Sequence, residues 1–223
     1  NVVVFLNGKY WGVYEVRERY DENYLSSIWD TDKDLDLVSQ QGFIHSGDND
    51  DWLKMLRYVQ NSDVSQTSVY DSIRKILDVN NMMDYFAAET FIVNNDWIGN
   101  YDYIKNIKIW RPDASGKWRY ILWDTDLGMG LDSYFGYDIL SYAINPPDPN
   151  PHSDLFRKLL TNPTIRNDFI NRYADLVNYH FETQRFRDLA QSMRDHIIPE
   201  MARHFAKWGD TTIANPYTLG EAY

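Results

Sequence analysis

The residues best suited to chemistry fall in two acidic clusters, and the first is a polar loop centred on Asp96. In that loop Asp96 stands four residues before Asn100. A carboxylate that accepts a hydroxyl proton, followed closely by an amide that ligates a metal ion, is the layout of a phosphotransferase catalytic loop. The ordinary alternative is a helix C-cap and turn, which polar runs of this kind commonly form. Asp96 is therefore our candidate general base.

The second acidic cluster is Asp124-Thr125-Asp126, which follows an apolar run and leads into a glycine-rich segment. We predict that a strand continues through the cluster, so that alternation places both carboxylates on one face. Two like charges that close repel each other unless a cation lies between them, which favours a divalent metal. The ordinary alternative is a hydrophilic strand end. Because a predicted hairpin joins the two clusters, we expect Asp96, Asp124 and Asp126 to meet at one site.

The composition excludes several other kinds of site and partner. The chain has no cysteine, so disulfides and thiolate metal sites are excluded. Its five histidines show no ligand spacing, and the sequence contains no Ser-His-Asp arrangement and no glycine-rich phosphate loop. A net charge of −11 argues against a nucleic-acid partner, because phosphate backbones are held by clustered Lys and Arg. No apolar run approaches the roughly 20 residues that span a bilayer, so we expect no membrane span.

The elements that position both clusters can be predicted from periodicity and turn residues. Asn7-Gly8 between two β-rich runs, Val2–Leu6 and Tyr10–Arg17, predicts a β-hairpin. Apolar residues at helical spacing predict helices, and turns containing Pro and Gly separate them from strands. The predicted helices are Asp21–Leu25, Trp52–Gln60, Val69–Leu77, Val79–Val93, Ser153–Leu160, Pro163–Phe181 and Thr183–Trp208, and the further strands are Leu35–Val38, Ile104–Trp110 and Lys117–Trp123. Strands and helices are segregated along the chain, which indicates an α+β fold.

Three sequence blocks carry a family resemblance. They are LNGKYWGVYEVRERYD (6–21), DYFAAETFIVNNDWIGN (84–100) and KIWRPDASGKWRYILWDTDLGMG (108–130). Together they resemble the spore coat protein H (CotH) kinase family, whose members carry an NG turn followed by G-x-Y, an N-x-D-W-x-x-N loop and a D-x-D strand end. The three motifs come in the family's order, and the resemblance continues more loosely through the helical tail.

The resemblance implies an α+β, protein-kinase-like fold. Residues 1–20 would be the remnant of an N-lobe β-sheet with the hinge, and residues 21–223 a mainly helical C-lobe with a central β-hairpin. It also implies a kinase that uses ATP and Mg²⁺ or Mn²⁺ to phosphorylate Ser/Thr hydroxyls of a protein substrate. Family members are often exported or coat-associated, so we expect an extracellular, cell-surface or spore-coat location.

The resemblance also assigns the site residues. Asp96 would be the catalytic base and Asn100 a metal ligand. Asp124 and Asp126 would be the metal-binding acids, with Asp126 in the place of the kinase Asp-Phe-Gly aspartate. Five residues intervene between this loop and Asn106, where the family passes straight into an Asn-containing strand. Either Asn100 or Asn106 therefore takes the role of the amide ligand.

On the nucleotide side, Glu15 and Glu18 would lie at the strand end and hinge beside the adenine. The family has a substantial region before the NG hairpin. By analogy with protein kinases, that region holds the loop that covers the phosphates, the lysine that binds ATP and the glutamate that pairs with this lysine. None of these can be placed here, since Lys9 is the one lysine in the sequence before Glu15. We therefore expect the sequence to be the later part of a small lobe plus the large lobe.

Two alternatives to a kinase stay open. Asp124-Thr125-Asp126 has the form of the DxD motif of a sugar-nucleotide glycosyltransferase, although no alternating βα pattern precedes it. A catalytically inactive structural or carbohydrate-associated module on the same scaffold is the other alternative, and the 8 Trp and 17 Tyr residues favour it modestly.

Overall fold

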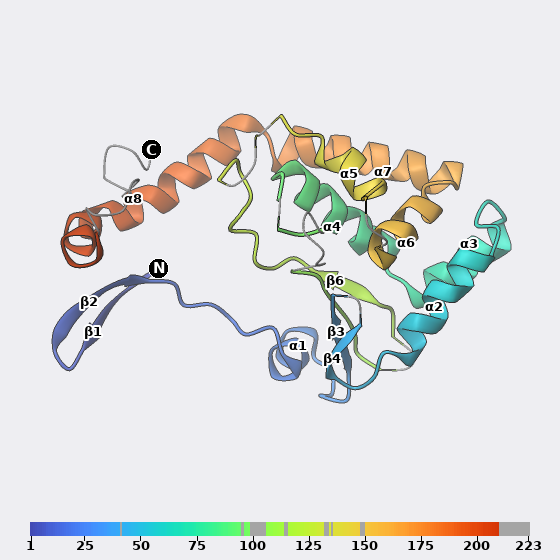
Figure 1. Ribbon diagram of the computed structural model, residues 1–223, viewed down its shortest axis with the longest axis horizontal. Helices are drawn as coiled ribbons and strands as arrows, with labels where there is room; N and C mark the ends of the chain where they lie inside the picture. The colour runs from blue at the N-terminus through green and yellow to red at the C-terminus, as the bar shows by residue number, and fades with distance from the viewer. Residues whose placement is uncertain are drawn as a thin grey trace. The chain divides into compact units, whose positions relative to one another are not determined.

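The computed structural model describes residues 1–40, 42–94, 96–98, 106–113, 116–131, 134, 136–147 and 150–209. Over these residues the chain forms two compact units, and Figure 1 shows their elements. The larger unit is Tyr20–Leu176, and the smaller combines Asn1–Arg19 with the described residues that follow Leu176. Helices predominate, and the strands form two small antiparallel sheets. The predicted α+β class, with a small β portion and a mainly helical part, is confirmed.

The larger unit contains a four-stranded antiparallel sheet with strand order β4-β3-β5-β6. Its strands are β3 (Asp36–Ser39), β4 (Phe43–Ser46), β5 (Lys108–Arg111) and β6 (Arg119–Ile121). β5 and β6 form the predicted central hairpin, but both are shorter than predicted. β6 ends at Ile121 because its partner strand begins opposite it at Lys108, just after Asn106 in the left-handed region at φ 53°. The strand therefore does not continue into the acidic cluster.

The helices of the larger unit begin at residues that suit a helix N-terminus. Side chains of Asp21, Asp78, Asn150 and Asn162 accept hydrogen bonds from backbone N–H groups of the first turn and so cap their helices. The helices are α1 (Glu22–Trp29), α2 (Asp50–Asn61), α3 (Thr67–Ile76), α4 (Val79–Phe91), α5 (Ile139–Ile144), α6 (Pro151–Leu159) and α7 (Pro163–Asp175). The helix predicted to reach Phe181 ends at Asp175, because the backbone changes there to a π-helix, η1 (Leu176–His180).

Helix α4 is the centre of the core and is buried on nearly every side. Phe86 stacks on Phe156 of α6 with ring centroids 4.0 Å apart. Tyr85 stacks on Tyr120 of β6 at 4.8 Å. Trp97, which is completely buried, packs edge-on against both Phe86 at 5.2 Å and Tyr85 at 5.8 Å. The helix thereby fixes the position of the loop that carries Asp96 relative to the sheet.

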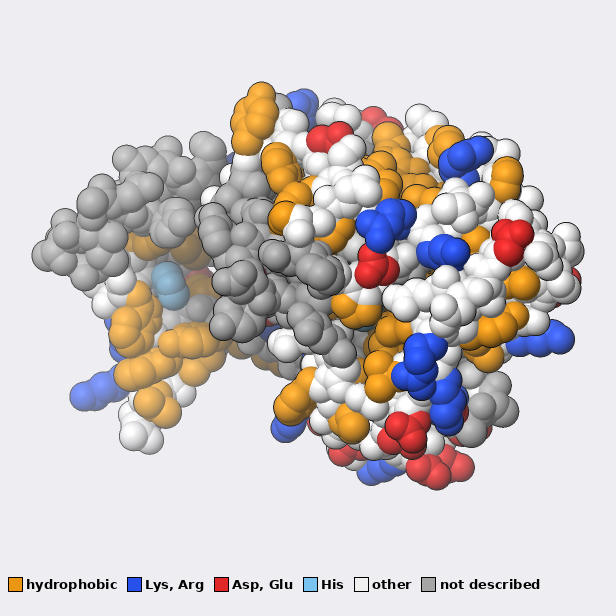
Figure 2. Space-filling view, turned by 45° about the vertical axis from the view of Figure 1, so that its right-hand side comes forward, with side chains coloured by type: hydrophobic (Ala, Val, Ile, Leu, Met, Phe, Trp, Pro, Cys, Tyr) orange, Lys and Arg blue, Asp and Glu red, His pale blue; other side chains and the backbone are white. Residues whose placement is uncertain are grey.

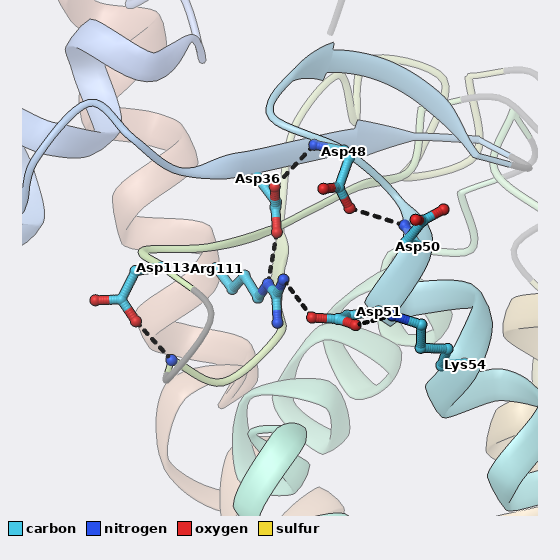
Figure 3. Close-up of polar contacts among 8 residues, drawn as sticks. Asp36, Asp48, Asp50, Asp51, Lys54, Arg111 and Asp113 are labelled. Atoms are coloured by element: carbon cyan, nitrogen blue, oxygen red, sulfur yellow. Dashed lines mark hydrogen bonds and ion pairs between the residues drawn. The ribbon is translucent and has the colours of Figure 1, made fainter.

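A buried arginine ties the sheet to the start of α2 (Figure 3). The Nε atom of Arg111 on β5 donates to Asp36 Oδ2 on β3 at 2.6 Å, and its Nη2 atom donates to Asp51 Oδ2 on α2 at 2.8 Å. The other oxygen of Asp36 accepts from the backbone N–H of Asp48 at 2.8 Å. Asp36 and Asp51 are therefore members of an ion-pair network that joins β3 and β5 to the start of α2.

The smaller unit consists of a hairpin and a long helix. The hairpin pairs β1 (Val2–Leu6) with β2 (Lys9–Tyr14), and the helix is α8 (Thr183–Trp208), within the bounds predicted for it. Asn7 and Gly8 have φ values of 50° and 73°, as the predicted NG turn requires. The β2 strand is shorter than predicted, since it ends at Tyr14. None of the described helices, α8 included, is long and apolar enough to cross a membrane.

The contacts within the smaller unit join the two ends of the described chain. His204 Nδ1 accepts from the backbone N–H of Val13 at 3.0 Å, across 191 residues. The indole rings of Trp11 and Trp208 pack edge-on with centroids 5.2 Å apart. Gly12 has a φ of 144°, and a Cβ there would lie 2.9 Å from Trp208 Nε1. Glycine therefore permits the close approach of β2 and α8.

Candidate functional site

The loop that carries Asp96 begins at the C-terminus of α4, which ends in a Schellman motif. The backbone N–H of Asn94 donates to the carbonyl of Glu89 at 3.1 Å, and that of Val93 donates to Thr90 at 3.3 Å. Val93 occupies the left-handed position of this motif at φ 52°. Glycine or asparagine usually fills that position, and a β-branched residue is strained there. The surrounding contacts must therefore hold the backbone in this conformation.

Asn94 supplies two of those contacts and is itself completely buried. Its Nδ2 atom donates to Glu89 Oε2 at 2.8 Å, and its Oδ1 atom accepts from the backbone N–H of Asp96 at 3.1 Å. The amide of Asn94 thus connects the last turns of α4 to the residue predicted to be the general base. The position of the Asp96 backbone is therefore set by hydrogen bonds inside the core and not at the surface.

The side chain of Asn106 holds the other side of Asp96. Its Nδ2 atom donates to Asp96 Oδ2 at 3.1 Å and to the Asp96 backbone carbonyl at 3.0 Å. Asn106 lies immediately before the β5 region, so the hairpin brings it back to the loop. Of the two alternatives for an amide near Asp96, the structure places Asn106 there, while Asn100 lies outside the described residues.

The acidic cluster after β6 adopts a turn, so the prediction of a strand through it is wrong. Asp124 has a φ of 55°, and the backbone N–H of Gly128 donates to Thr125 at 3.1 Å. Strand alternation therefore does not set the direction of the Asp124 and Asp126 side chains. Asp124 is half-buried, while Asp126 is exposed.

This turn is attached to the same end of α4 as the Asp96 loop. The backbone N–H of Met129 donates to the carbonyl of Ile92 at 2.6 Å. A Cβ at Gly128 would lie 3.2 Å from that carbonyl oxygen, a tight contact that glycine avoids. The C-terminus of α4 is therefore the common support of both acidic segments. That Asp124 and Asp126 share one site with Asp96 stays a prediction.

The carboxylate and amide oxygens of these residues are of the kinds that a hard divalent cation takes as ligands. Within the described part of the chain, no group of three or more His, Asp or Glu side chains is placed to hold a metal ion by itself. Mg²⁺ commonly takes one or two carboxylates and fills its remaining positions with water and substrate phosphate oxygens. Asp124 and Asp126 with the amide oxygen of Asn106 would fit that mode.

Glu89 is a buried acidic group that is hydrogen-bonded to Asn94 of the loop. Burial raises the pKa of Glu89 to about 7, although the Asn94 amide and the Tyr85 hydroxyl act in the opposite direction. Burial also raises the pKa of Tyr85 well above its usual range. Sequence reasoning did not single out Glu89. The available signal was an acidic residue within the largely apolar stretch that forms the last turns of α4.

The two predicted nucleotide-side residues lie in the smaller unit, after the end of β2. Glu15 is exposed and its Oε2 atom accepts from Arg17 Nε at 2.6 Å, and Glu18 is also exposed. Their assignment to the neighbourhood of an adenine stays a prediction.

Comparison with known proteins gives one match. A family model described as CotH kinase protein matches residues 1–220. No curated protein and no solved structure matches the chain. The match covers both acidic segments, the hairpin of the smaller unit and the helices that follow.

Proposed function

The chain belongs to the CotH kinase family, and on that basis we propose that it is a protein kinase. It transfers the γ-phosphate of ATP to a Ser or Thr hydroxyl of a protein substrate with the help of Mg²⁺ or Mn²⁺. The observation that carries the proposal is the environment of Asp96. Its backbone N–H is held by Asn94, and its carboxylate and carbonyl are held by Asn106.

In this proposal Asp96 accepts the proton of the substrate hydroxyl. A general base must be held within hydrogen-bond reach of the group that it deprotonates, and its orientation decides much of its effect. The contacts from Asn94 and Asn106 supply that orientation from two directions. The buried ring of Trp97, next in the sequence, anchors the loop in the core.

Asp124 and Asp126 would hold the metal ion, together with an amide oxygen from Asn106 or Asn100. When bound, the ion would neutralise negative charge on the phosphates during transfer. The turn that carries both acids is fixed to α4 by the hydrogen bond from Met129 to Ile92. Glu15 and Glu18 would belong to the strand end and hinge on the adenine side, where the backbone and not the side chains would bind the base.

The sheet gives no support to a sugar-nucleotide transferase. In the described residues, every strand pair of the sheet that precedes Asp124 is antiparallel. The βα units that would bind a sugar nucleotide need parallel strands joined by crossover helices. An inactive module on the same scaffold remains the alternative that experiment must exclude.

The test is phosphate transfer by the protein, measured with radiolabelled ATP and Mg²⁺ on a panel of protein acceptors. We expect Asp96→Asn and Asp126→Asn to lower kcat by roughly 100-fold or more, because each removes a group that acts on the transferring atoms. The matched control is Asp71→Asn, an exposed aspartate on α3, which should retain wild-type activity.

Circular dichroism should show that all three variants are folded. Wild-type transfer rates in folded Asp96→Asn and Asp126→Asn would refute the assignments. A wild-type protein that binds glycans but no ATP would establish the inactive module instead.

A further inference from the structure

Glu89 is an acidic residue in the most buried helix of the protein. Its exposed fraction is 0%, and apart from Thr90 its neighbours along the last turns of α4 are apolar or aromatic. Burial of a carboxyl group is unfavourable unless its oxygens are paired, and a leucine or methionine would fill the same space without that cost. Packing alone therefore does not explain why a carboxyl group occupies this position.

Its hydrogen bonds lead directly to the proposed catalytic loop. Glu89 Oε2 accepts from Asn94 Nδ2 at 2.8 Å, and Asn94 Oδ1 accepts from the backbone N–H of Asp96 at 3.1 Å. Without the carboxyl group, the buried amide N–H of Asn94 would lose this partner, and the amide would be free to turn. The backbone of Asp96 depends on which way that amide points.

The backbone between the two residues is strained, which makes an external support necessary. Val93 has a left-handed φ of 52° and lies in the core with 9% of its surface exposed. A β-branched residue persists in that conformation only where surrounding contacts determine it. The side-chain bond from Glu89 to Asn94 spans Val93 and reinforces the backbone bond between the same two residues.

We infer that Glu89 is a positioning residue for the Asp96 loop, acting through Asn94, an inference that rests on the proposed function. The carboxyl group fixes the amide of Asn94, the amide fixes the N–H of Asp96, and Asn106 completes the support from the opposite side. Glu89 touches neither substrate nor metal in this arrangement. It sets the direction from which the Asp96 carboxylate acts.

Two aromatic side chains lie beside the rest of the Glu89 carboxyl group. The Tyr85 hydroxyl acts on the pKa of Glu89, and the Trp97 N–H acts on that of Tyr85, so the three groups are close neighbours. The rings of Tyr85 and Trp97 pack edge-on with centroids 5.8 Å apart. Trp97 follows Asp96 in the sequence, so this buried cluster also includes a residue of the Asp96 loop.

The test compares Glu89→Leu with Glu89→Gln in the full-length protein. Leucine removes the acceptor for Asn94, whereas the glutamine amide oxygen can replace it. We expect Glu89→Leu to lower kcat about 10- to 100-fold, as a misplaced catalytic group does, with KM for ATP little changed. Glu89→Gln should restore most of kcat. Hydrogen exchange of the peptide that contains Asp96 should be faster in Glu89→Leu only.

Two further variants keep the result decisive. Asn94→Ala breaks the same connection from its other end and should reproduce the faster exchange at Asp96, even where Glu89→Leu does not fold. Thr90→Val is the matched structural control, because the Thr90 hydroxyl is buried in the same helix but, within the described residues, bonds to the carbonyls of Phe86 and Ala87 and not to the Asp96 loop. It should leave both kcat and the exchange at Asp96 unchanged.

The inference would be overturned if folded Glu89→Leu or Asn94→Ala exchanged at Asp96 at the wild-type rate. It would also be overturned if Thr90→Val lost as much kcat as Glu89→Leu. The exchange measurement needs no catalysis. A wild-type protein without phosphate transfer would therefore refute the proposed function, while the exchange rates would still decide whether Glu89 holds the loop.

Discussion

At the scale of single residues, two buried titratable groups respond to pH in opposite directions. Glu89 has its pKa raised by burial to about 7. His152 is stacked on Trp52 and bonded to Tyr120 and to the carbonyl of Gln40, and burial lowers its pKa to about 4. Both groups favour the neutral form in the folded state. Glu89 therefore destabilises the fold as pH rises, and His152 does so as pH falls.

The effect of Glu89 on stability can be isolated with Glu89→Gln. The unfolded carboxyl group ionises near pH 4.5 and the folded one near 7, so its stabilising contribution is complete below 4.5 and is lost as pH rises through 7. We expect Glu89→Gln to gain up to about 3 kcal/mol relative to wild type between pH 5 and pH 8. Urea unfolding of both proteins across that range measures the difference in the free energy of unfolding. The contribution of His152 cancels in this difference because both proteins contain it. A constant difference would show that Glu89 does not change its ionisation with folding.

At the scale of elements, the ion-pair network of Arg111 decides how β3, β5 and α2 fit together. The guanidinium and Asp36 are both buried, and Asp51 stands at the start of α2. The adjoining pair of Lys54 and Asp51 is exposed on both sides. A buried charge that loses its partner is costly, whereas an exposed pair contributes little.

We therefore expect Arg111→Met to lower the free energy of unfolding by about 3–5 kcal/mol at neutral pH, because Asp36 is left buried without its cation. Lys54→Met, the control, should change it by about 0.5 kcal/mol or less. Combining Arg111→Met with Asp36→Leu should recover much of the loss. Chemical denaturation measures all three. Equal effects of the two single substitutions would show that burial does not strengthen the Arg111 network.

At the scale of the whole molecule, the two compact units differ in how much core they contain. The larger unit holds the buried aromatic core around α4, whereas the described part of α8 has no buried residue. A two-stranded hairpin by itself is only marginally stable in water. The smaller unit depends instead on a few contacts, such as those of Trp11, His204 and Trp208.

We expect hydrogen exchange to report this difference. Amides of β1, β2 and α8 should exchange through openings of lower free energy than those of α4, since local stability follows the buried contacts of each region. Gly12→Ala should accelerate exchange in these three elements and not in α4, because the added Cβ meets Trp208 and the φ of 144° disfavours a side chain. Mass spectrometry of exchanged peptides gives both results. Equal protection of α4 and α8 in the wild type would contradict the expected order.

Much of this protein follows from local sequence. Asn7-Gly8 specifies the hairpin because both residues must take positive φ, and α4 and α8 form at nearly the bounds predicted for them. The three motifs at the Asn7-Gly8 hairpin, around Asp96 and around Asp124 together were sufficient to identify the family. These signals are local, since they depend on turn chemistry and on periodicity within one element.

The tertiary structure decided which residues far apart in the sequence contact one another. It brought Asn106 to Asp96, made Glu89 the buried support of Asn94, and ended β6 before the acidic turn. It also joined α8 to the hairpin, across 191 residues between Val13 and His204. Periodicity within one element carries no information about such contacts, because they form only when separate elements pack and pair their polar groups together.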